Sequence, residues 1–373
     1  MSMLVVNVGS SSVRLSLFRQ AEAGLVCLMT AHYRESVGDG GALLSAFLAS
    51  LEGEAGEIDC VVHRIVHGGA LFSAPVVIDS SVEAAIEQLA PLAPLHNPTA
   101  LSWVRLSRHL LGDKVVQVAV FDTAFYHNLP AVAATYALPQ RLCQQHNIRR
   151  YGFHGIAHRA MLKGWQAIRP QLVEGGRVIS VQLGSGCSVT AIDHGVAVDT
   201  SMGFSPLEGL VMATRSGDVD PALILYLQRE VGLSVSEVER LLSERSGLLG
   251  LSGASSDMQR LLESQGAEAK LAIDLYCYRV RKYIGAYLAV LGGADAILFG
   301  GGVGEHSSHV RAVILRGLTD LGIDLDSTVN SEVVATEGCI SSVGSSTEVW
   351  VMKVDEAREM AEVVIDGIDN YAV

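Results

Sequence analysis

Two glycine- and serine-rich turns in the sequence have the residue types that bind phosphate. Gly184-Ser185-Gly186 follows the apolar run 178–181 and precedes the alternating segment 188–192. Near the N-terminus, residues 9–12 (GSSS) separate the apolar run 4–7 from the alternating segment 13–18. Each set predicts a strand, a tight turn and a returning strand. Such a turn directs backbone N–H groups and hydroxyls toward one point, as a phosphate oxyanion requires.

One turn of this kind is usually an ordinary hairpin, but here the pattern recurs. A third glycine-rich turn, 300–304, follows the strand-like run 296–299. The chain contains neither a G-x-x-x-x-G-K-[ST] loop nor a G-x-G-x-x-G turn leading into a helix. We therefore predict a phosphate site built on hairpins, in a chain made of two related halves.

Composition narrows the classes of protein further. A length of 373 residues favours two domains, and a net charge of −13 argues against a nucleic-acid-binding surface. Without an apolar stretch of about 18 residues or a leader-like N-terminus, we expect a soluble, cytoplasmic protein that does not enter membranes. The six cysteines are scattered without metal-site spacing, so we expect them to be reduced and mostly buried. An anionic substrate would depend on a few local arginines.

The elements that must position a site alternate between strands and helices, which indicates an α/β fold. Val115 to Phe121 is typical of a strand buried on both faces, and it delivers Asp122 to the carboxyl edge where open sheets bind ligands. Prolines at 91, 94 and 98 predict that His96 and Asn97 are exposed on a loop. We expect Ser80 or Ser81 to cap one helix, Ser234 and Glu237 to form a capping box, and 267–291 to be a long buried helix.

Seven longer strings resemble the acetokinase family, within the superfamily that joins acetate and sugar kinases to actin and heat-shock chaperones. They are NVGSSSV (7–13), HRIVHGG (63–69), PLAPLHNP (91–98), VFDTAF (120–125), RRYGFHG (149–155), DTSMGFSPLEGL (199–210) and TRSGDVDP (214–221). The resemblance implies two RNase H-like domains with mixed sheets flanked by helices, and an active site in the cleft between them. The first would span 1–150 together with the C-terminal helix and tail, 357–373, and the second, nucleotide-binding domain would span 151–356.

The resemblance also implies a reaction and roles for residues. The reaction is reversible, Mg²⁺-dependent transfer of the ATP γ-phosphoryl group to acetate, giving acetyl phosphate and ADP, by a homodimer, with Mn²⁺ as an alternative ion. Arg64 resembles the acetate-binding arginine, Arg215 the one that stabilises the transition state, His154 the donor to the transferring phosphoryl group and Asp122 the essential carboxylate. Asn7 and Glu356 match metal-placing positions. The acyl pocket matches Val66, Leu95, Phe153 and Pro206. The nucleotide site matches Ser10, Ser12, Arg14, Gln182, Leu183, Gly184, Ser185, Gly186, Asp257, Met258, Gln259, Gly302, Val303, Gly304, Glu305 and His306.

Five positions depart from the family pattern, all on the nucleotide side. Arg14 replaces lysine, Gln182 histidine, Ser185 asparagine, Gln259 arginine and His306 asparagine. We therefore expect poor discrimination between ATP and GTP. Within enzymes, the alternatives are another short carboxylate, such as propionate or butyrate, or another donor, such as GTP or pyrophosphate. A nucleotide-binding switch module without kinase activity is the alternative from another class, although it would have no use for an acyl pocket beside Arg64.

Overall fold

The computed structural model describes residues 1–9, 12–22, 24–34, 40–51, 57–94 and 96–367, and the chain divides into two compact units. Unit 1 comprises Met1–His127, Phe153–Ile156 and Asp355–Val373, and unit 2 comprises Asn128–Gly152 and Ala157–Val354. Residues 128–150, which we expected in the first domain, group with unit 2 in this division. The end of the expected C-terminal tail, 368–373, lies outside the described residues.

Unit 1 contains a six-stranded sheet in the order β3-β2-β1-β4-β6-β5. Strands β1, β2 and β3 are antiparallel neighbours, β4 and β6 continue the sheet parallel to β1, and β5 is antiparallel to β6. The strands are β1 (Ser2–Val8), β2 (Ser12–Ala21), β3 (Gly24–Arg34), β4 (Cys60–Ile65), β5 (Val76–Val77) and β6 (Val116–Phe121).

The sheet of unit 2 repeats this topology, in the order β11-β12-β10-β7-β8-β9. Strands β7, β8 and β9 are antiparallel neighbours, β10 and β12 continue parallel to β7, and β11 is antiparallel to β12. The strands are β7 (Arg177–Leu183), β8 (Cys187–Asp193), β9 (Val196–Thr200), β10 (Ala296–Gly300), β11 (Gly338–Cys339) and β12 (Glu348–Val351). The predicted hairpins and the two related halves are therefore confirmed.

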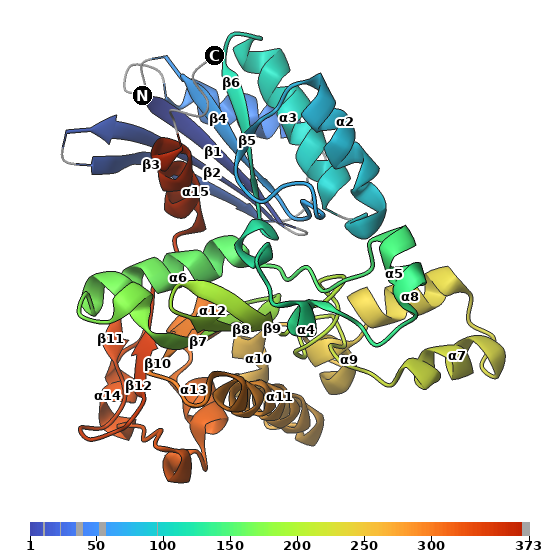
Figure 1. The fold of residues 1–373 in the computed structure, drawn as a ribbon, viewed down its shortest axis with the longest axis vertical. Coiled ribbons are helices and arrows are strands. Elements are labelled where there is room, and N and C mark those ends of the chain that lie inside the picture. The colour runs from blue at the N-terminus through green and yellow to red at the C-terminus, as the bar shows by residue number, and fades with distance from the viewer. Residues whose placement is uncertain (10–11, 23, 35–39, 52–56, 95, 368–373) are drawn as a thin grey trace. The chain divides into compact units, whose positions relative to one another are not determined.

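Helices flank both sheets (Figure 1). Those of unit 1 are α1 (Gly40–Ala49), α2 (Ser80–Gln88), α3 (Asn97–Leu111) and α15 (Glu356–Asp366). Those that follow the crossing into unit 2 are α4 (Ala131–Ala134), α5 (Gln140–His146), α6 (Gly155–Ile168), α7 (Pro221–Arg229), α8 (Val235–Glu244), α9 (Gly247–Ser252), α10 (Met258–Glu263), α11 (Ala267–Leu291), α12 (Gly301–His306), α13 (Ser308–Leu315) and α14 (Ser327–Glu332). None of the helices in the described ranges is both long and apolar enough to span a membrane.

The alternation of side chains along β1 builds two core layers on its sheet. Met3 and Val5 face one side and pack with Met360 of α15. Leu4 and Val6 face the other side and pack with helix residues that include Phe47 of α1 and Trp103 of α3. Because successive side chains of a strand point to opposite faces, a continuous apolar run is what a sheet covered on both sides requires.

Local signals in the sequence located several elements correctly. The 267–291 helix and the Ser234–Glu237 capping box are both present. The expectation that the 267–291 helix is buried was wrong, because it buries only part of its surface and Leu271, Tyr278 and Val290 are more than half exposed. Three other expectations were wrong. Helix α2 is capped by Asp79, whose side chain accepts from the Val82 N–H, rather than by Ser80 or Ser81. The turn at 300–304 is the start of α12 rather than a hairpin.

The third wrong expectation concerns Asn97, which is fully buried as the first residue of α3. Its neighbour Pro98 lacks a backbone N–H and therefore suits the start of a helix, so α3 begins one residue before the proline. The cysteines are all free, as expected; Cys60, Cys187 and Cys277 are buried, whereas Cys27 is exposed.

Candidate active site

The carboxyl ends of three neighbouring strands in unit 1 carry polar side chains. Asn7 lies near the end of β1, Arg64 near the end of β4, and Asp122 directly after β6. Because these strands are parallel, their carboxyl ends meet at one edge of the sheet. The edge therefore collects an amide, a guanidinium and a carboxylate from positions far apart in the chain.

Arg64 and Asp122 form a bidentate ion pair at this edge. Arg64 Nε donates to Asp122 Oδ1 at 3.0 Å and its terminal nitrogen donates to Oδ2 at 2.6 Å. The side chains are 12% and 1% exposed. Burial acts to lower the pKa of Arg64, but the carboxylates of Asp122 and Glu356 more than offset it, so the pKa is raised and the guanidinium stays charged. Burial raises the pKa of Asp122, and Arg64 opposes that rise.

Asn7 connects Arg64 to Glu356 at the start of α15. Its Oδ1 accepts from Arg64 at 3.1 Å, and its Nδ2 donates to Glu356 Oε2 at 2.7 Å. No group of three His, Cys, Asp or Glu side chains in the described part of the chain could hold a metal by itself. Asn7 and Glu356 nevertheless provide an amide and a carboxylate oxygen, a donor set that suits Mg²⁺, which usually takes one or two protein ligands and completes its shell with water and phosphate.

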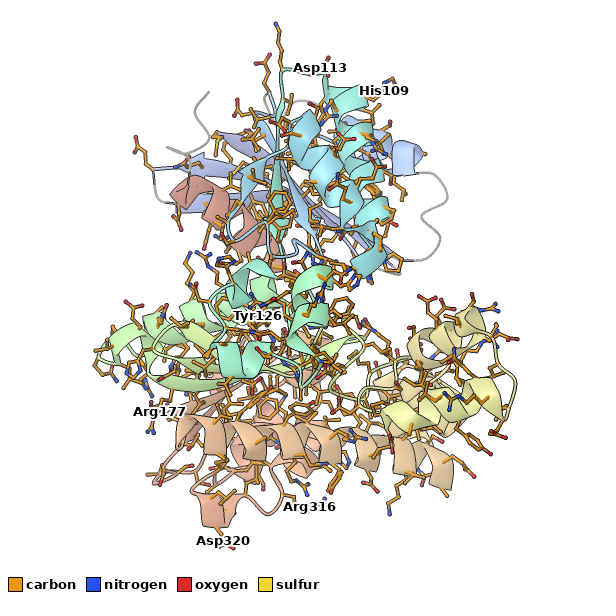
Figure 2. All side chains as sticks on the ribbon, turned by 45° about the vertical axis from the view of Figure 1, so that its right-hand side comes forward. His109, Asp113, Tyr126, Arg177, Arg316 and Asp320 are labelled. Atoms are coloured by element: carbon orange, nitrogen blue, oxygen red, sulfur yellow. The ribbon has the colours of Figure 1, made fainter. Side chains whose placement is uncertain are left out.

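His154 is held against this edge in an uncommon backbone conformation. Its φ is +59°, in the left-handed region that few residues other than glycine adopt. The His154 backbone amide donates to the Asp122 carboxylate, and the Gly155 N–H donates to the Asp122 carbonyl at 3.0 Å. Tyr126, labelled in Figure 2, donates from its hydroxyl to the Phe153 carbonyl at 2.8 Å. Residues 153–155 of the YGFHG segment are thus fixed to the residues that follow β6.

The residues after Arg64 are held by a buried clamp that the sequence did not reveal. Asn97 Oδ1 accepts from the His67 N–H at 3.1 Å, and Asn97 Nδ2 donates to the His67 carbonyl at 3.0 Å. The His67 ring contacts Phe153 edge-on, with centroids 5.3 Å apart. Val66 is 6% exposed and Phe153 is 1% exposed. Val66 directly precedes His67 in the chain and Phe153 contacts its ring, so these two candidate acyl-pocket residues both adjoin His67. Leu95, a third candidate, lies outside the described residues.

In unit 2 the glycine turn after β7 is joined to the segment that carries Arg215. The Gly184 N–H donates to the Gly186 carbonyl at 3.0 Å, which closes the turn. The Ser185 carbonyl accepts from the Ala213 N–H at 3.0 Å. Arg215 donates to the Pro206 carbonyl at 2.5 Å. The structure thus brings the predicted phosphate turn, Pro206 and Arg215 into one connected region.

The turn into α12 lies next to the end of β7. Gly300 pairs with Gln182 in the sheet, and a Cβ on Gly301, whose φ is +76°, would come within 2.8 Å of Gln182 Nε2. Glu305 Oε1 accepts from the Gly301 N–H at 3.1 Å. Sequence reasoning missed Arg311, which is fully buried and donates to the Gly304 and Glu305 carbonyls at 2.7 and 3.1 Å. Arg311 therefore satisfies the last carbonyls of this short helix.

The remaining nucleotide candidates lie in three places. Asp257 caps α10 by accepting from the Arg260 N–H, Met258 is buried, and Gln259 is exposed and donates to Glu263. The imidazole of His306 contacts the Gly302 carbonyl at 3.0 Å. Ser12 and the exposed Arg14 lie on β2 of unit 1, and Ser10 lies outside the described residues.

Comparison with known proteins agrees with the motifs. Residues 2–362 match the model of the acetokinase family. The chain belongs to this family. The acetate kinase of Chloroherpeton thalassium is 46% identical over 310 residues, covering 82% of this chain and 74% of that protein. The acetate kinase of Desulfotalea psychrophila is 38% identical over 404 residues, covering 98% and 100%.

Solved structures of the family have the same fold. The acetate kinase of Porphyromonas gingivalis superposes with a TM-score of 0.88 at 36% identity, covering 98% of this chain and 99% of that one. A propionate kinase from Francisella tularensis gives the same TM-score at 34% identity, covering 97% and 98%. Each unit thus has the RNase H-like topology of an actin-like ATPase.

In this acetokinase, the residues that sequence reasoning missed share one property. Both form hydrogen bonds to backbone groups of other segments: Asn97 to the distant His67, and Arg311 to Gly304 in the neighbouring turn. A buried asparagine after a proline-rich segment and an arginine in an apolar helix leave only weak signals in a sequence, because their partners are fixed by the fold.

Proposed function

We propose that this protein is a kinase that transfers the γ-phosphoryl group of ATP reversibly to acetate, forming acetyl phosphate and ADP. The observation that carries the proposal is the buried Arg64–Asp122 pair at the carboxyl edge of β1, β4 and β6, with Asn7 and Glu356 beside it. A switch protein has no need for a buried guanidinium at this edge. Membership of the acetokinase family favours the same conclusion.

Arg64 would bind the acetate carboxylate, because a guanidinium offers a planar fork of donors to two oxygens. Asp122 already occupies one edge of this guanidinium. Its role would be to fix the plane of Arg64 and to keep its charge beside the substrate. A general base is unnecessary, because acetate is ionised at neutral pH. An acetate oxygen attacks the γ-phosphorus in line, and the bond from that phosphorus to the bridging oxygen of ADP breaks.

The negative charge on the transferring group calls for positive donors around it. His154 would donate to its equatorial oxygens, held by a backbone of positive φ whose N–H donates a hydrogen bond to the Asp122 carboxylate. Arg215 would neutralise the charge that develops in the transition state. Donors held in place before the reaction cost little reorganisation when charge moves.

Asn7 and Glu356 would place the Mg²⁺ ion that accompanies ATP. The bound ion neutralises phosphate charge, and Mn²⁺ offers an alternative with similar ligand preferences. Asn7 would contribute its Oδ1 and Glu356 its carboxylate, and hydrogen bonds orient both side chains. Removal of divalent ions with EDTA should abolish turnover, and added Mg²⁺ should restore it.

The nucleotide would bind to the glycine turns of unit 2. The turn 184–186 and the start of α12 follow β7 and β10, which are parallel neighbours. Gln182 Oε1 is buried without a hydrogen-bond partner among the described residues, which leaves an acceptor available beside the turn. Gln259 is exposed at the start of α10. With glutamines at both positions, we propose that the enzyme accepts GTP nearly as well as ATP.

The acyl pocket would be formed by Val66, Leu95, Phe153 and Pro206 and would favour acetate. Propionate is the second candidate, because the F. tularensis relative of equal structural similarity is named a propionate kinase. One methylene is worth about 1–3 kcal/mol of discrimination, so propionate should remain a weaker substrate.

A hydroxamate assay for acyl phosphate tests the proposal. Acetate, propionate and butyrate are each offered with ATP, GTP or pyrophosphate in the presence of Mg²⁺. We expect the highest kcat/KM with acetate, and a collapse of activity in Arg215→Ala that leaves thermal stability unchanged. Absence of acyl phosphate with every pair, in a protein that binds nucleotide, would overturn the kinase assignment.

We also propose that two copies associate through a face of unit 2 that includes α7. This helix has no buried residue, and Leu223, Leu225 and Tyr226 are 44%, 48% and 56% exposed. Light scattering should give the mass of a dimer for the protein and that of a monomer for Leu225→Lys.

A cytoplasmic location, proposed from ATP use and the six free cysteines, can be tested by cell fractionation.

A further inference from the structure

We propose that Tyr136, Arg150 and Glu208 form a positioning set for Arg215. The inference rests on the proposed function, because it assigns these side chains to orienting the arginine that neutralises the transferring phosphoryl group. Tyr136 lies outside the seven family strings, whereas Arg150 and Glu208 lie within two of them without an assigned role. All three, together with Arg215, belong to unit 2, so the contacts that connect them lie within one compact body.

The centre of the set is the carboxylate of Glu208. The hydroxyl of Tyr136 donates to Glu208 Oε2 in a short hydrogen bond, and Arg150 donates to Glu208 Oε1 at 2.6 Å. The guanidinium of Arg150 also lies over the Tyr136 ring, 5.6 Å from its centroid. The carboxylate is thus held at both oxygens by two side chains that also contact each other, and this fixes its orientation.

The same two side chains hold the backbone of the loop that begins at Thr200. Arg150 donates to the Thr200 and Met202 carbonyls, each at 3.1 Å. The Phe204 N–H donates to the Tyr136 hydroxyl at 2.7 Å. Gly203 lies between these anchors, and a Cβ at this position would overlap both Glu208 Oε2 and Tyr136 Oη. The loop therefore packs directly on these partly buried side chains, and glycine is required at the point of closest approach.

The loop carries the acceptor that holds Arg215. Pro206 lies two residues before Glu208, and its carbonyl accepts from the Arg215 guanidinium at 2.5 Å. Beyond Glu208, Asp218 closes the same segment, because its Oδ1 accepts from the Gly209 N–H at 2.7 Å. The backbone from Phe204 to Gly209 is therefore held at both ends, which constrains the position of the Pro206 carbonyl and, through it, that of Arg215.

The position of Arg215 should affect the rate of phosphoryl transfer. A displacement of about 1 Å in a charge-stabilising group can cost up to about 100-fold in rate. The hydroxyl of Tyr136 is itself removable without changing side-chain shape, since phenylalanine fills nearly the same volume. Loss of this hydrogen bond frees one oxygen of Glu208 and the Phe204 N–H together.

The decisive experiment is a double-mutant cycle between Tyr136→Phe and Arg215→Lys, measured by acyl phosphate formation in the full-length protein. We expect Tyr136→Phe to lower kcat about tenfold or more, with KM for acetate and ATP changed less than about threefold. In the Arg215→Lys background the same substitution should cause little further loss, because residues that act through one group are not additive. Glu208→Gln should behave like Tyr136→Phe.

Glu348→Gln is the matched control for Glu208→Gln, because Glu348 accepts from Arg169 at 2.9 and 2.7 Å and is similarly exposed, but lies on β12 of the same unit, outside the loop. A similar fall in kcat for this control, or full additivity of Tyr136→Phe with Arg215→Lys, would assign the positioning set to general stability and overturn the inference. An inactive wild-type protein would instead contradict the proposed function, so the two failures are distinguishable.

Discussion

Acidification should destabilise unit 1 through His63, a histidine buried in the middle of the first sheet. His63 lies on β4, is 1% exposed, and its Nε2 lies 2.7 Å from Gln117 Oε1. Its Nδ1 is buried without a hydrogen-bond partner among the described residues. A second proton would therefore have to enter an unsolvated site. Burial lowers the pKa of His63 from 6.5 to about 4, although the hydrogen bond that His63 donates to Gln117 Oε1 opposes this.

The sign and size of the effect follow from linkage. The unfolded chain binds a proton at this histidine below pH 6.5, whereas the folded protein does so only near pH 4. Stability is therefore lost as the pH falls through this window, because the unfolded state binds more protons. The loss is about 2 kcal/mol at pH 5 and about 3 kcal/mol once the pH is below 4.

Urea unfolding at pH 7 and pH 5, at constant ionic strength, measures this loss in the free energy of unfolding. Trp103 is buried in unit 1, so its fluorescence in a Trp165→Phe, Trp350→Phe background follows that unit. The comparison protein carries His63→Gln in the same background, which removes the titration while keeping a donor toward Gln117. We expect the parent to lose about 2 kcal/mol more than this variant between the two pH values. Equal losses in both proteins would refute the burial argument.

The other predictions concern the candidate active site. Asp122→Asn leaves the Arg64 charge without its carboxylate and should lower the free energy of unfolding by about 3–5 kcal/mol, together with activity; unchanged urea stability would contradict the ion-pair assignment. Val66→Ala should raise the ratio of propionate to acetate kcat/KM by about tenfold or more, and an unchanged ratio would remove Val66 from the acyl pocket. Steady-state kinetics should give ATP and GTP similar kcat/KM values, and a large ATP preference would show that Gln182 and Gln259 do not relax base selection.

Much of the fold could be predicted because its signals are local. Alternating and continuous apolar runs predicted the hairpins β1–β2 and β7–β8, since side-chain direction repeats every two residues in a strand. The start of α8 was predictable from Ser234 and Glu237, which satisfy each other's neighbouring backbone groups within one turn. Where two capping residues compete over a short distance, as Asp79 does with Ser80, sequence alone chose wrongly.

The candidate site was only partly predictable, for a different reason. The position of Asp122 at the end of a buried strand followed from the pattern, because the carboxyl edge of a parallel sheet is defined by chain direction. Its pairing with Arg64 could not be predicted. Arg64 is 58 residues away, and nothing in the local pattern of either residue specifies a bidentate pair. The resemblance to a family supplied roles for both residues, without the contact between them.

The sequence by itself determined the α/β class, the repeated halves, the glycine turns and the positions of the long helices, because these depend on periodicity and capping within a few residues. Only the tertiary structure decided that Asn97 is buried against the His67 backbone, that His154 adopts a positive φ, and that Asn7 meets Glu356 across 349 residues. Such contacts depend on how strands pair and helices pack, and a side chain finds its distant partner only when the whole sheet has formed.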